Sequence, residues 1–215
     1  MQKILKTINL IEKQVKKFRI PSVTEVSYRK DPYQILISCI LSLRTKDKTT
    51  TVASRRLFRV AASPKTMVKL SPRRLQDLIY PVGFYRNKAK VILGISRKIL
   101  KDFMGRVPNQ IEDLLKLKGV GRKTANLVLG LGYNIPAICV DTHVHRISNR
   151  LGWVRTKTPE QTEYALQKIV PKKSWIDLNT ALVTFGQNIC LPISPWCNRC
   201  SVYNFCERTG VTKFR

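Results

Sequence analysis

Acidic residues are scarce in this sequence of 215 residues, which has 13 Asp and Glu against 40 Lys and Arg and a formal net charge of +27. Charge of this size repels itself and attracts polyanions over about one Debye length or more. We therefore expect a negatively charged partner, with nucleic acid first and an anionic membrane surface second. Charge kept for solubility alone is the alternative.

Long hydrophobic runs are also missing. No stretch approaches the roughly 20 apolar residues that a membrane-spanning helix requires. The N-terminal segment is interrupted by lysines and lacks the continuous apolar part of a secretory signal. We expect no membrane association and an intracellular location, in the cytoplasm or nucleoid if the source is prokaryotic.

Alternating strand patterns and low-complexity linkers are absent as well, and a helical period replaces them. Ile4, Ile8, Ile11, Val15 and Phe18 recur at spacings of four and three, as one apolar face of a helix does. Helix start signals recur as Ser-Pro pairs and as capping-box spacings. They are Ser63-Pro64, Ser71-Pro72, Asn109 with Glu112, and Thr158 with Gln161. We predict an all-α protein with short connections.

A glycine-containing turn between two helical segments is the central motif. The segments are 111–117 and 122–131, and the turn contains Gly119, Val120 and Gly121, followed by Arg122. Glycines permit a tight turn and close backbone approach, and Val120 can anchor the turn in the core. Exposed amides at a helix N-terminus suit phosphate. The motif therefore predicts a helix-hairpin-helix that grips the DNA backbone without reading sequence; a purely structural turn is the alternative.

Lys123 stands in the first turn of the second helical segment. The helix dipole and the neighbouring Arg122 both disfavour an ammonium group there and so favour the free amine, which is the nucleophilic form. Lys123 is the candidate nucleophile, and one more phosphate-binding lysine is the competing interpretation.

Asp141 follows the apolar run 135–140 and is an acid in a strongly basic chain. A carboxylate stabilises the positive charge that develops on a sugar when an N-glycosidic bond breaks, and it can deprotonate an amine or a water. The alternative is an N-cap, since Asp before helical residues is a common capping arrangement. One side chain can serve both purposes.

Four of the six cysteines, Cys190, Cys197, Cys200 and Cys206, form the pattern C-x6-C-x2-C-x5-C. In a chain with no sign of secretion, thiols this close favour metal ligands over disulfides. Zinc sites usually pair two short knuckles across a longer loop, and only one short knuckle exists here. The spacing therefore favours a 4Fe–4S cluster over zinc.

With Lys123, Asp141 and the cysteine pattern together, the chain resembles the endonuclease III family of base-excision glycosylases. The residues that carry the resemblance are 117–126, 140–143, Asn149-Arg150 and the four cysteines, and the match runs from about residue 30 to Cys206. The cysteine pattern downstream of such a hairpin and aspartate is very specific, whereas the hairpin alone is not.

The resemblance implies a two-lobed fold: a helical barrel lobe with the hairpin at 25–135, and an iron–sulfur cluster lobe made of 1–24 with 136–215. It implies double-stranded DNA with damaged bases or abasic sites as partner, and we expect a monomer. It assigns attack on C1′ of the damaged nucleotide to Lys123 and assistance to Asp141. By similarity, Phe84 is the apolar wedge that fills the gap left by the extruded nucleotide, and Arg44 enters from the other side.

Three departures from the family are visible. Many relatives carry Gln where this chain has Arg44, so the preferred opposite base is left open. The hairpin reads Leu-Lys-Gly where Leu-Pro-Gly is common, so Lys118 offers an added phosphate contact. Relatives often carry basic residues in the loop that spans 191–196 here, but this loop contains no Lys or Arg. We therefore assign it no phosphate-binding role, and Arg199 is the candidate for that role.

Other functions compete with this interpretation. A monofunctional adenine-mismatch glycosylase shares the hairpin, aspartate and cluster but generally lacks the lysine and carries a further C-terminal domain. The lysine also argues against a thymine-mismatch glycosylase. A non-catalytic, cluster-containing DNA-binding module would need neither Lys123 nor Asp141.

Overall fold

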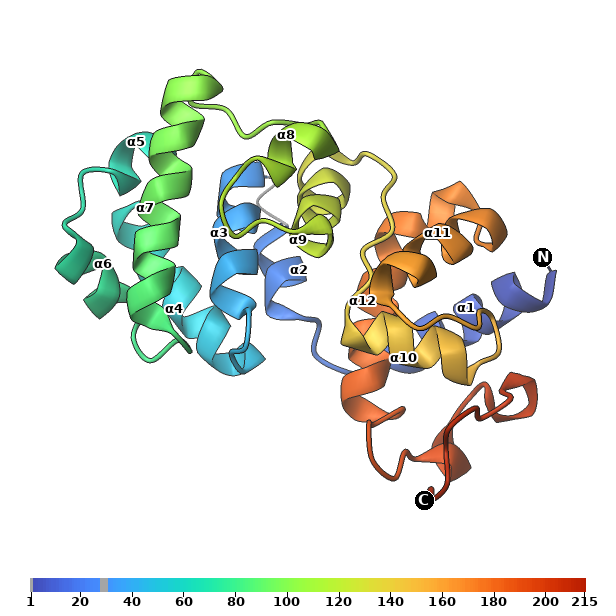
Figure 1. The fold of residues 1–215 in the computed structure, drawn as a ribbon. Coiled ribbons are helices and arrows are strands. Elements are labelled where there is room, and N and C mark those ends of the chain that lie inside the picture. The colour runs from blue at the N-terminus through green and yellow to red at the C-terminus, as the bar shows by residue number, and fades with distance from the viewer. Residues whose placement is uncertain (1, 28–30) are drawn as a thin grey trace. The chain divides into compact units, whose positions relative to one another are not determined.

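The computed structural model describes residues 2–27 and 31–215. Residue 1 of the predicted cluster lobe and residue 30, near which the family resemblance is expected to begin, lie outside the described residues. The all-α prediction is confirmed, because the described ranges contain helices and turns and no strand (Figure 1). No described helix is long and apolar enough to cross a membrane.

The chain forms two compact units, one of residues 22–135 and one of residues 1–21 with 136–215. We call them the hairpin unit and the cysteine unit, after the motifs they contain. The prediction places the first boundary after residue 24, which would divide the helix Ser22–Ser27. Because that helix packs against its neighbours in the hairpin unit, residues 22–24 belong there.

The hairpin unit is organised around one buried helix, α3. Its elements are α2 (Ser22–Ser27), α3 (Pro32–Ser42), α4 (Asp47–Val60), α5 (Pro64–Met67), α6 (Pro72–Ile79), α7 (Tyr85–Asp102), α8 (Ile111–Leu115), α9 (Arg122–Leu127) and the π-helical turn η1 (Val128–Gly132). Every residue of α3 from Tyr33 to Leu41 is buried, because α2, α4, α7, α9 and η1 all pack around it (Figure 1). A helix enclosed on all sides needs no polar face.

The cysteine unit joins the N-terminal helix to the C-terminal half of the chain. Its elements are α1 (Gln2–Val15), α10 (Thr142–Arg150), α11 (Pro159–Ile169), η2 (Lys172–Ser174), α12 (Trp175–Asn188), η3 (Cys197–Arg199) and η4 (Tyr203–Phe205). Helix α12 packs against α1 and α10 over a core that includes Ile8, Ile11 and Phe185. Helix α1 ends before Phe18, yet Phe18 packs against the same core, so the predicted apolar face is retained.

Most predicted helix starts are confirmed. Ser63 and Ser71 each accept a hydrogen bond from the third residue beyond them, with proline in the first turn. Thr158 accepts from the backbone of Gln161, whose own side chain bonds Lys157. The Asn109–Glu112 box is wrong: α8 begins at Ile111, so Gln110 occupies the N-cap and makes no side-chain bond.

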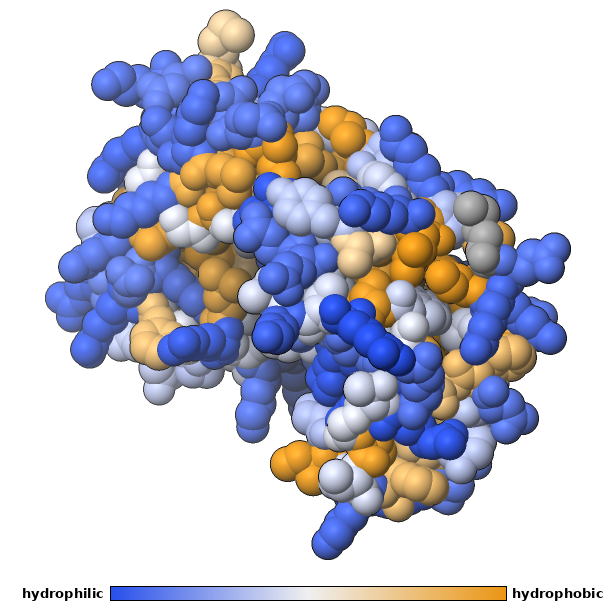
Figure 2. Space-filling model, turned by 45° about the vertical axis from the view of Figure 1, so that its right-hand side comes forward, coloured by the Kyte–Doolittle hydropathy of each residue, from blue (hydrophilic) through white to orange (hydrophobic). Residues whose placement is uncertain are grey.

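The surface agrees with the composition. Figure 2 shows hydrophilic side chains over most of the visible face, with smaller apolar areas between them.

Candidate functional site

The predicted hairpin is formed between α8 and α9. Leu117 and Val120 turn into the core, and the backbone of Gly119 adopts φ +84°, in the left-handed region that favours glycine. A Cβ at Gly119 would also lie 3.1 Å from a methyl group of Val91, so the glycine is required twice over. A Cβ at Gly121 would meet no atom within 4 Å, so that position is not crowded. Gly121 is the N-cap of α9 and makes no side-chain hydrogen bond.

Lys123 lies in the first turn of α9 and is partly buried. Burial raises the pKa of the Cys39 thiol on α3 to about 12, and the positive charge of Lys123 opposes that rise. The predicted nucleophile is thus close enough to the central helix to act on Cys39 electrostatically. The second predicted helical segment ends as α-helix at Leu127, and η1 continues it to Gly132.

Arg44 and Phe84 come from separate loops and meet. The Arg44 guanidinium lies 5.8 Å from the centre of the Phe84 ring, within range of a cation–π interaction. Phe84 is 64% exposed, although it is large and apolar. Both residues adopt positive φ, 50° at Arg44 and 57° at Phe84, which is unfavourable for side chains of this size.

A buried lysine that the sequence analysis did not single out links these two loops. The Lys88 ammonium donates hydrogen bonds to the carbonyl oxygens of Leu41 and Leu43 and to the Thr45 hydroxyl. Burial lowers the pKa of Lys88 to about 8. A signal was available, because Lys88 occupies the apolar register of α7, in line with Ile92, Ile95 and Ile99.

Asp141 is the N-cap of α10. Its Oδ1 atom accepts hydrogen bonds from the backbone N–H groups of His143 and Val144, each at 2.9 Å. The residues before it, Ile138 to Val140, are buried, so the chain leaves the core at this aspartate. Asp141 therefore does cap α10, as the alternative interpretation predicts. Both of these capping bonds go to Oδ1, and capping does not prevent the carboxylate from having a second role.

Arg146 connects α10, which Asp141 caps, to residues 190–206, which we call the cysteine segment. Its guanidinium donates to the carbonyl oxygen of Cys190 at 2.8 Å, and its charge interacts with Asp141. This packing requires a glycine on α12, because a Cβ at Gly186 would lie 2.4 Å from the His143 ring.

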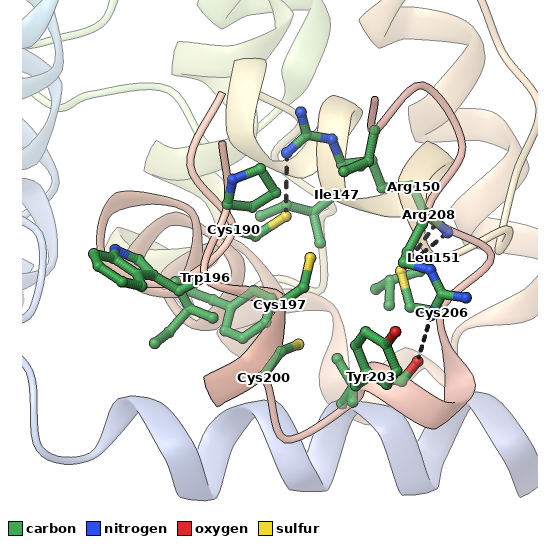
Figure 3. Close-up of a pocket in the computed structure, with 15 residues that line it drawn as sticks. Ile147, Arg150, Leu151, Cys190, Trp196, Cys197, Cys200, Tyr203, Cys206 and Arg208 are labelled. Carbon is green, nitrogen blue, oxygen red and sulfur yellow. Dashed lines mark hydrogen bonds between the residues drawn. The ribbon is translucent and has the colours of Figure 1, made fainter. Parts of the chain in front are cut away.

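The four cysteines of the C-x6-C-x2-C-x5-C pattern line one pocket, with walls from residues such as Ile147, Leu151 and Phe185 (Figure 3). All four are free thiols in the structure, as are the buried Cys39 and Cys139. No three His, Cys, Asp or Glu side chains of the described ranges converge on a point that would hold a single ion.

The chemistry of these donors fits a metal group. Burial, together with charge on its three cysteine neighbours, raises the pKa of the Cys200 thiol to about 12. Thiolates crowded in this way are stabilised when cations share the pocket. The Arg150 guanidinium and the backbone N–H of Arg208 already donate to the sulfurs of Cys190 and Cys206, as the second layer around a metal site does (Figure 3).

Besides Arg146, two further side chains outside the cysteine segment hold it in place. Arg150 donates to the carbonyl oxygens of Leu191 and Pro192, each at 2.7 Å. The Gln14 amide on α1 donates to the carbonyl of Arg199 at 2.6 Å and accepts from the N–H of Ser201 at 3.0 Å, so it bridges the residues on either side of Cys200. Gln14 gave no sequence signal, because its partners lie more than 180 positions away.

The structure thus brings the four cysteines together and places Arg44 in contact with Phe84. Lys123 lies in the first turn of α9, immediately after the hairpin turn. Lys123 belongs to the hairpin unit and Asp141 to the cysteine unit.

Comparisons with known proteins agree with one another. The family model described as HhH-GPD superfamily base excision DNA repair protein matches residues 37–172. The chain is 52% identical to endonuclease III of Thermotoga maritima over 177 residues, which is 82% of this chain and 83% of that protein. It is 41% identical to endonuclease III-like protein 1 of Gallus gallus, over 81% of this chain and 63% of the relative.

Solved structures give the same result. A trapped endonuclease III–DNA covalent intermediate, in an estranged-adenine complex, matches with a TM-score of 0.84 at 31% identity, over 97% of this chain and 96% of that one. A thermostable thymine-DNA glycosylase matches with a TM-score of 0.85 at 25% identity, over 96% of both chains.

Proposed function

Because this chain belongs to the endonuclease III family of base-excision DNA glycosylases and lyases, we propose that it removes oxidised pyrimidines from duplex DNA through a lysine Schiff base and then nicks the strand. The observation that carries the proposal is Lys123, an amine in the first turn behind the hairpin, where a glycosylase without lyase activity has no need of one. The trapped covalent intermediate is a structure of the related endonuclease III. Lys123 is the residue with which this chain would form such a covalent bond.

The first step is access to the base. The target atom is unreachable inside a duplex, so the nucleotide must turn out of the stack at a cost of a few kcal/mol. The hairpin at Gly119 to Arg122 holds the backbone, Phe84 fills the space that the nucleotide leaves, and Arg44 enters opposite the orphaned base. The net charge of +27 supplies the sequence-independent attraction to the duplex.

The second step is base release. The Lys123 amine attacks C1′, and the bond from C1′ to the base breaks with its electron pair leaving on the base. The Asp141 carboxylate stabilises the positive charge that develops on the sugar and takes a proton from the attacking amine. This step requires the Asp141 carboxylate to act on the amine of Lys123.

The third step is strand cleavage. The sugar opens to an imine on the Lys123 nitrogen, and the imine acidifies the C2′ proton. Loss of that proton drives β-elimination, in which the C3′–O bond breaks and the phosphate leaves. Water then releases Lys123.

We propose that Cys190, Cys197, Cys200 and Cys206 hold a 4Fe–4S cluster. Four protein thiolates leave no open position on the iron, so the cluster, when bound, supplies a fixed fold to the cysteine segment and takes no part in bond breaking. Metal and sulfide analysis of protein purified without oxygen tests this assignment. Brown protein with iron and inorganic sulfide supports it, and colourless protein loaded with zinc contradicts it.

Borohydride trapping tests the enzyme proposal. We expect the wild-type protein to become covalently linked to duplexes that contain an abasic site or thymine glycol, and Lys123→Ala to bind the same DNA without forming the adduct. A protein that binds well and never forms an adduct would be a DNA-binding module.

A G·T mismatch in the same panel tests the thymine-mismatch alternative, which the likeness to the thymine-DNA glycosylase structure favours. Base release from G·T and not from thymine glycol would replace the oxidised-pyrimidine assignment.

A further inference from the structure

Lys88 is a buried cation that the proposed chemistry does not use. It stands on α7, four residues after Phe84, and only 6% of its surface is exposed. Lysine is almost never buried to this extent unless its charge is compensated. Its surroundings therefore call for an explanation beyond packing.

The ammonium group meets three acceptors, and all three flank Arg44. They are the carbonyl oxygen of Leu41 at 2.8 Å, the carbonyl oxygen of Leu43, and the Thr45 hydroxyl at 3.1 Å. The two carbonyls stand at the C-terminus of α3, where backbone carbonyls lack helical partners and a positive charge is favoured. Only the protonated amine carries three donors for these three acceptors.

A second set of contacts holds the backbone next to Phe84 against the Arg44 loop. The Thr45 hydroxyl also accepts from the backbone N–H of Gly83 at 3.2 Å, so one oxygen bridges Lys88 and the residue before Phe84. A Cβ at Gly83 would lie 2.5 Å from the carbonyl oxygen of Arg44. The two backbones can approach this closely only because residue 83 is glycine.

We propose that Lys88 is a positioning residue that fixes Arg44 and Phe84 relative to each other, so that they enter the duplex as one rigid element. This inference rests on the proposed function, which assigns the two residues to the space left by the extruded nucleotide. It accounts for the left-handed backbone at both positions, since such conformations persist where surrounding contacts determine them.

Rigidity matters for this step because two side chains must enter the duplex together. Loops that are ordered only on insertion lose conformational freedom at that moment, and this cost is added to the cost of unstacking. Loops that are already fixed avoid the added cost. Loss of Lys88 should therefore slow the opening of paired DNA and spare the chemistry at Lys123.

The experiment compares Lys88→Met with Lys90→Met on two substrates. Methionine keeps the length of the lysine stem and removes the three donors. Lys90 is exposed on the same helix, so its replacement removes the same charge without touching the loops. One substrate is a duplex with a fully paired lesion, and the other carries an abasic site in a bubble of mismatched pairs that is already open.

We expect Lys88→Met to lower base release from the paired duplex about tenfold relative to Lys90→Met. Borohydride trapping on the bubble should stay within about twofold of wild type, because that substrate needs no wedge. A 2-aminopurine beside the lesion should report the same defect, as a slower rise in fluorescence on unstacking. Equal loss on both substrates, or no loss on either, would overturn the proposal.

Thr45→Val guards against a variant that merely fails to fold. It removes the bridging hydroxyl, preserves the shape of the side chain and leaves Lys88 in place. We expect a smaller defect, again confined to the paired duplex, and rescue by Thr45→Ser. Failure of the proposed function itself would look different, since wild-type protein would then form no adduct on either substrate.

Discussion

The hairpin unit and the cysteine unit place their functional residues by different means. In the hairpin unit, α3 is enclosed by its neighbours, and the buried Leu117 and Val120 anchor the hairpin turn. In the cysteine unit, the segment after α12 has only two short 3-10 helices, and polar side chains such as Gln14 and Arg150 tie it down. A regular core thus holds its elements largely by apolar packing, whereas an irregular segment depends more on hydrogen bonds.

Each unit nevertheless contains one polar residue that holds two backbone segments. Lys88 joins the loops of Arg44 and Phe84, and Gln14 bridges the backbone around Cys200. Each unit also has an aspartate at a helix N-cap, Asp31 before α3 and Asp141 before α10. These pairs allow the same chemical change to be made in both units.

The aspartate pair gives the largest expected effect. Asparagine caps a helix about as well as aspartate, so Asp141→Asn should preserve α10 while removing the charge. We expect base release to fall about 10²–10⁴-fold, because the role proposed for this carboxylate is proton transfer and charge stabilisation.

Asp31→Asn is the matched control, since Asp31 accepts from the N–H groups of Tyr33 and Gln34 in the same way. It should leave turnover near the wild-type level in single-turnover assays. An equal loss in both variants would mean that Asp141 only caps its helix.

The Gln14 bridge should control how firmly the cysteine segment is held. Gln14→Leu leaves the carbonyl of Arg199 and the N–H of Ser201 without their amide partner. In protein that carries the proposed iron–sulfur cluster, we expect the visible absorption of Gln14→Leu to be lost about tenfold faster than that of the wild type when an iron chelator is added.

Asn9→Leu is the control, because Asn9 is an exposed amide on the same helix. Equal bleaching of the two variants would show that the bridge contributes nothing to retention of the cluster.

Titration of Lys88 should be visible in the ratio of activity on paired DNA to activity on the bubble. The pKa of Lys88 lies at about 8, below its ordinary value, because of burial. As pH rises through that value the group loses a proton, leaving two donors for three acceptors, and the ratio should fall about threefold to tenfold. Effects of pH on chemistry that both substrates share cancel in the ratio.

Lys90→Met should show the same fall, and Lys88→Met should show a flat ratio at the lower level. A flat ratio in the wild-type protein would separate Lys88 from the opening step.

Helix capping gives the smallest effect. Ser71→Ala removes the bond to the N–H of Arg74 at the start of α6 and should cost about 1 kcal/mol of unfolding free energy. Urea denaturation followed by circular dichroism measures it. The bleaching rate of the cluster should not change, because α6 belongs to the other unit, and a change would show that the two units unfold together.

Local features of the fold can be predicted from the order of the residues. Helical periodicity gave the fold class, Ser63 and Ser71 marked helix starts, and the cysteine spacing grouped four thiols that do line one pocket. These signals are readable because their partners lie within a few residues along the chain. The Asn109 box failed for a local reason too, since a start one residue later moves Glu112 out of the capping position.

Contacts between residues far apart in the chain depend on how the helices pack. The ammonium of Lys88 finds its acceptors more than 40 residues away, and Gln14 finds its own more than 180 away. Lys88 leaves only its place in the apolar register of α7, which names no partner, and Gln14 leaves no signal. A hydrogen bond between remote segments depends on how whole helices pack. The candidate site residues are therefore visible in the chain, whereas the partners of Lys88 and Gln14 are visible only in the fold.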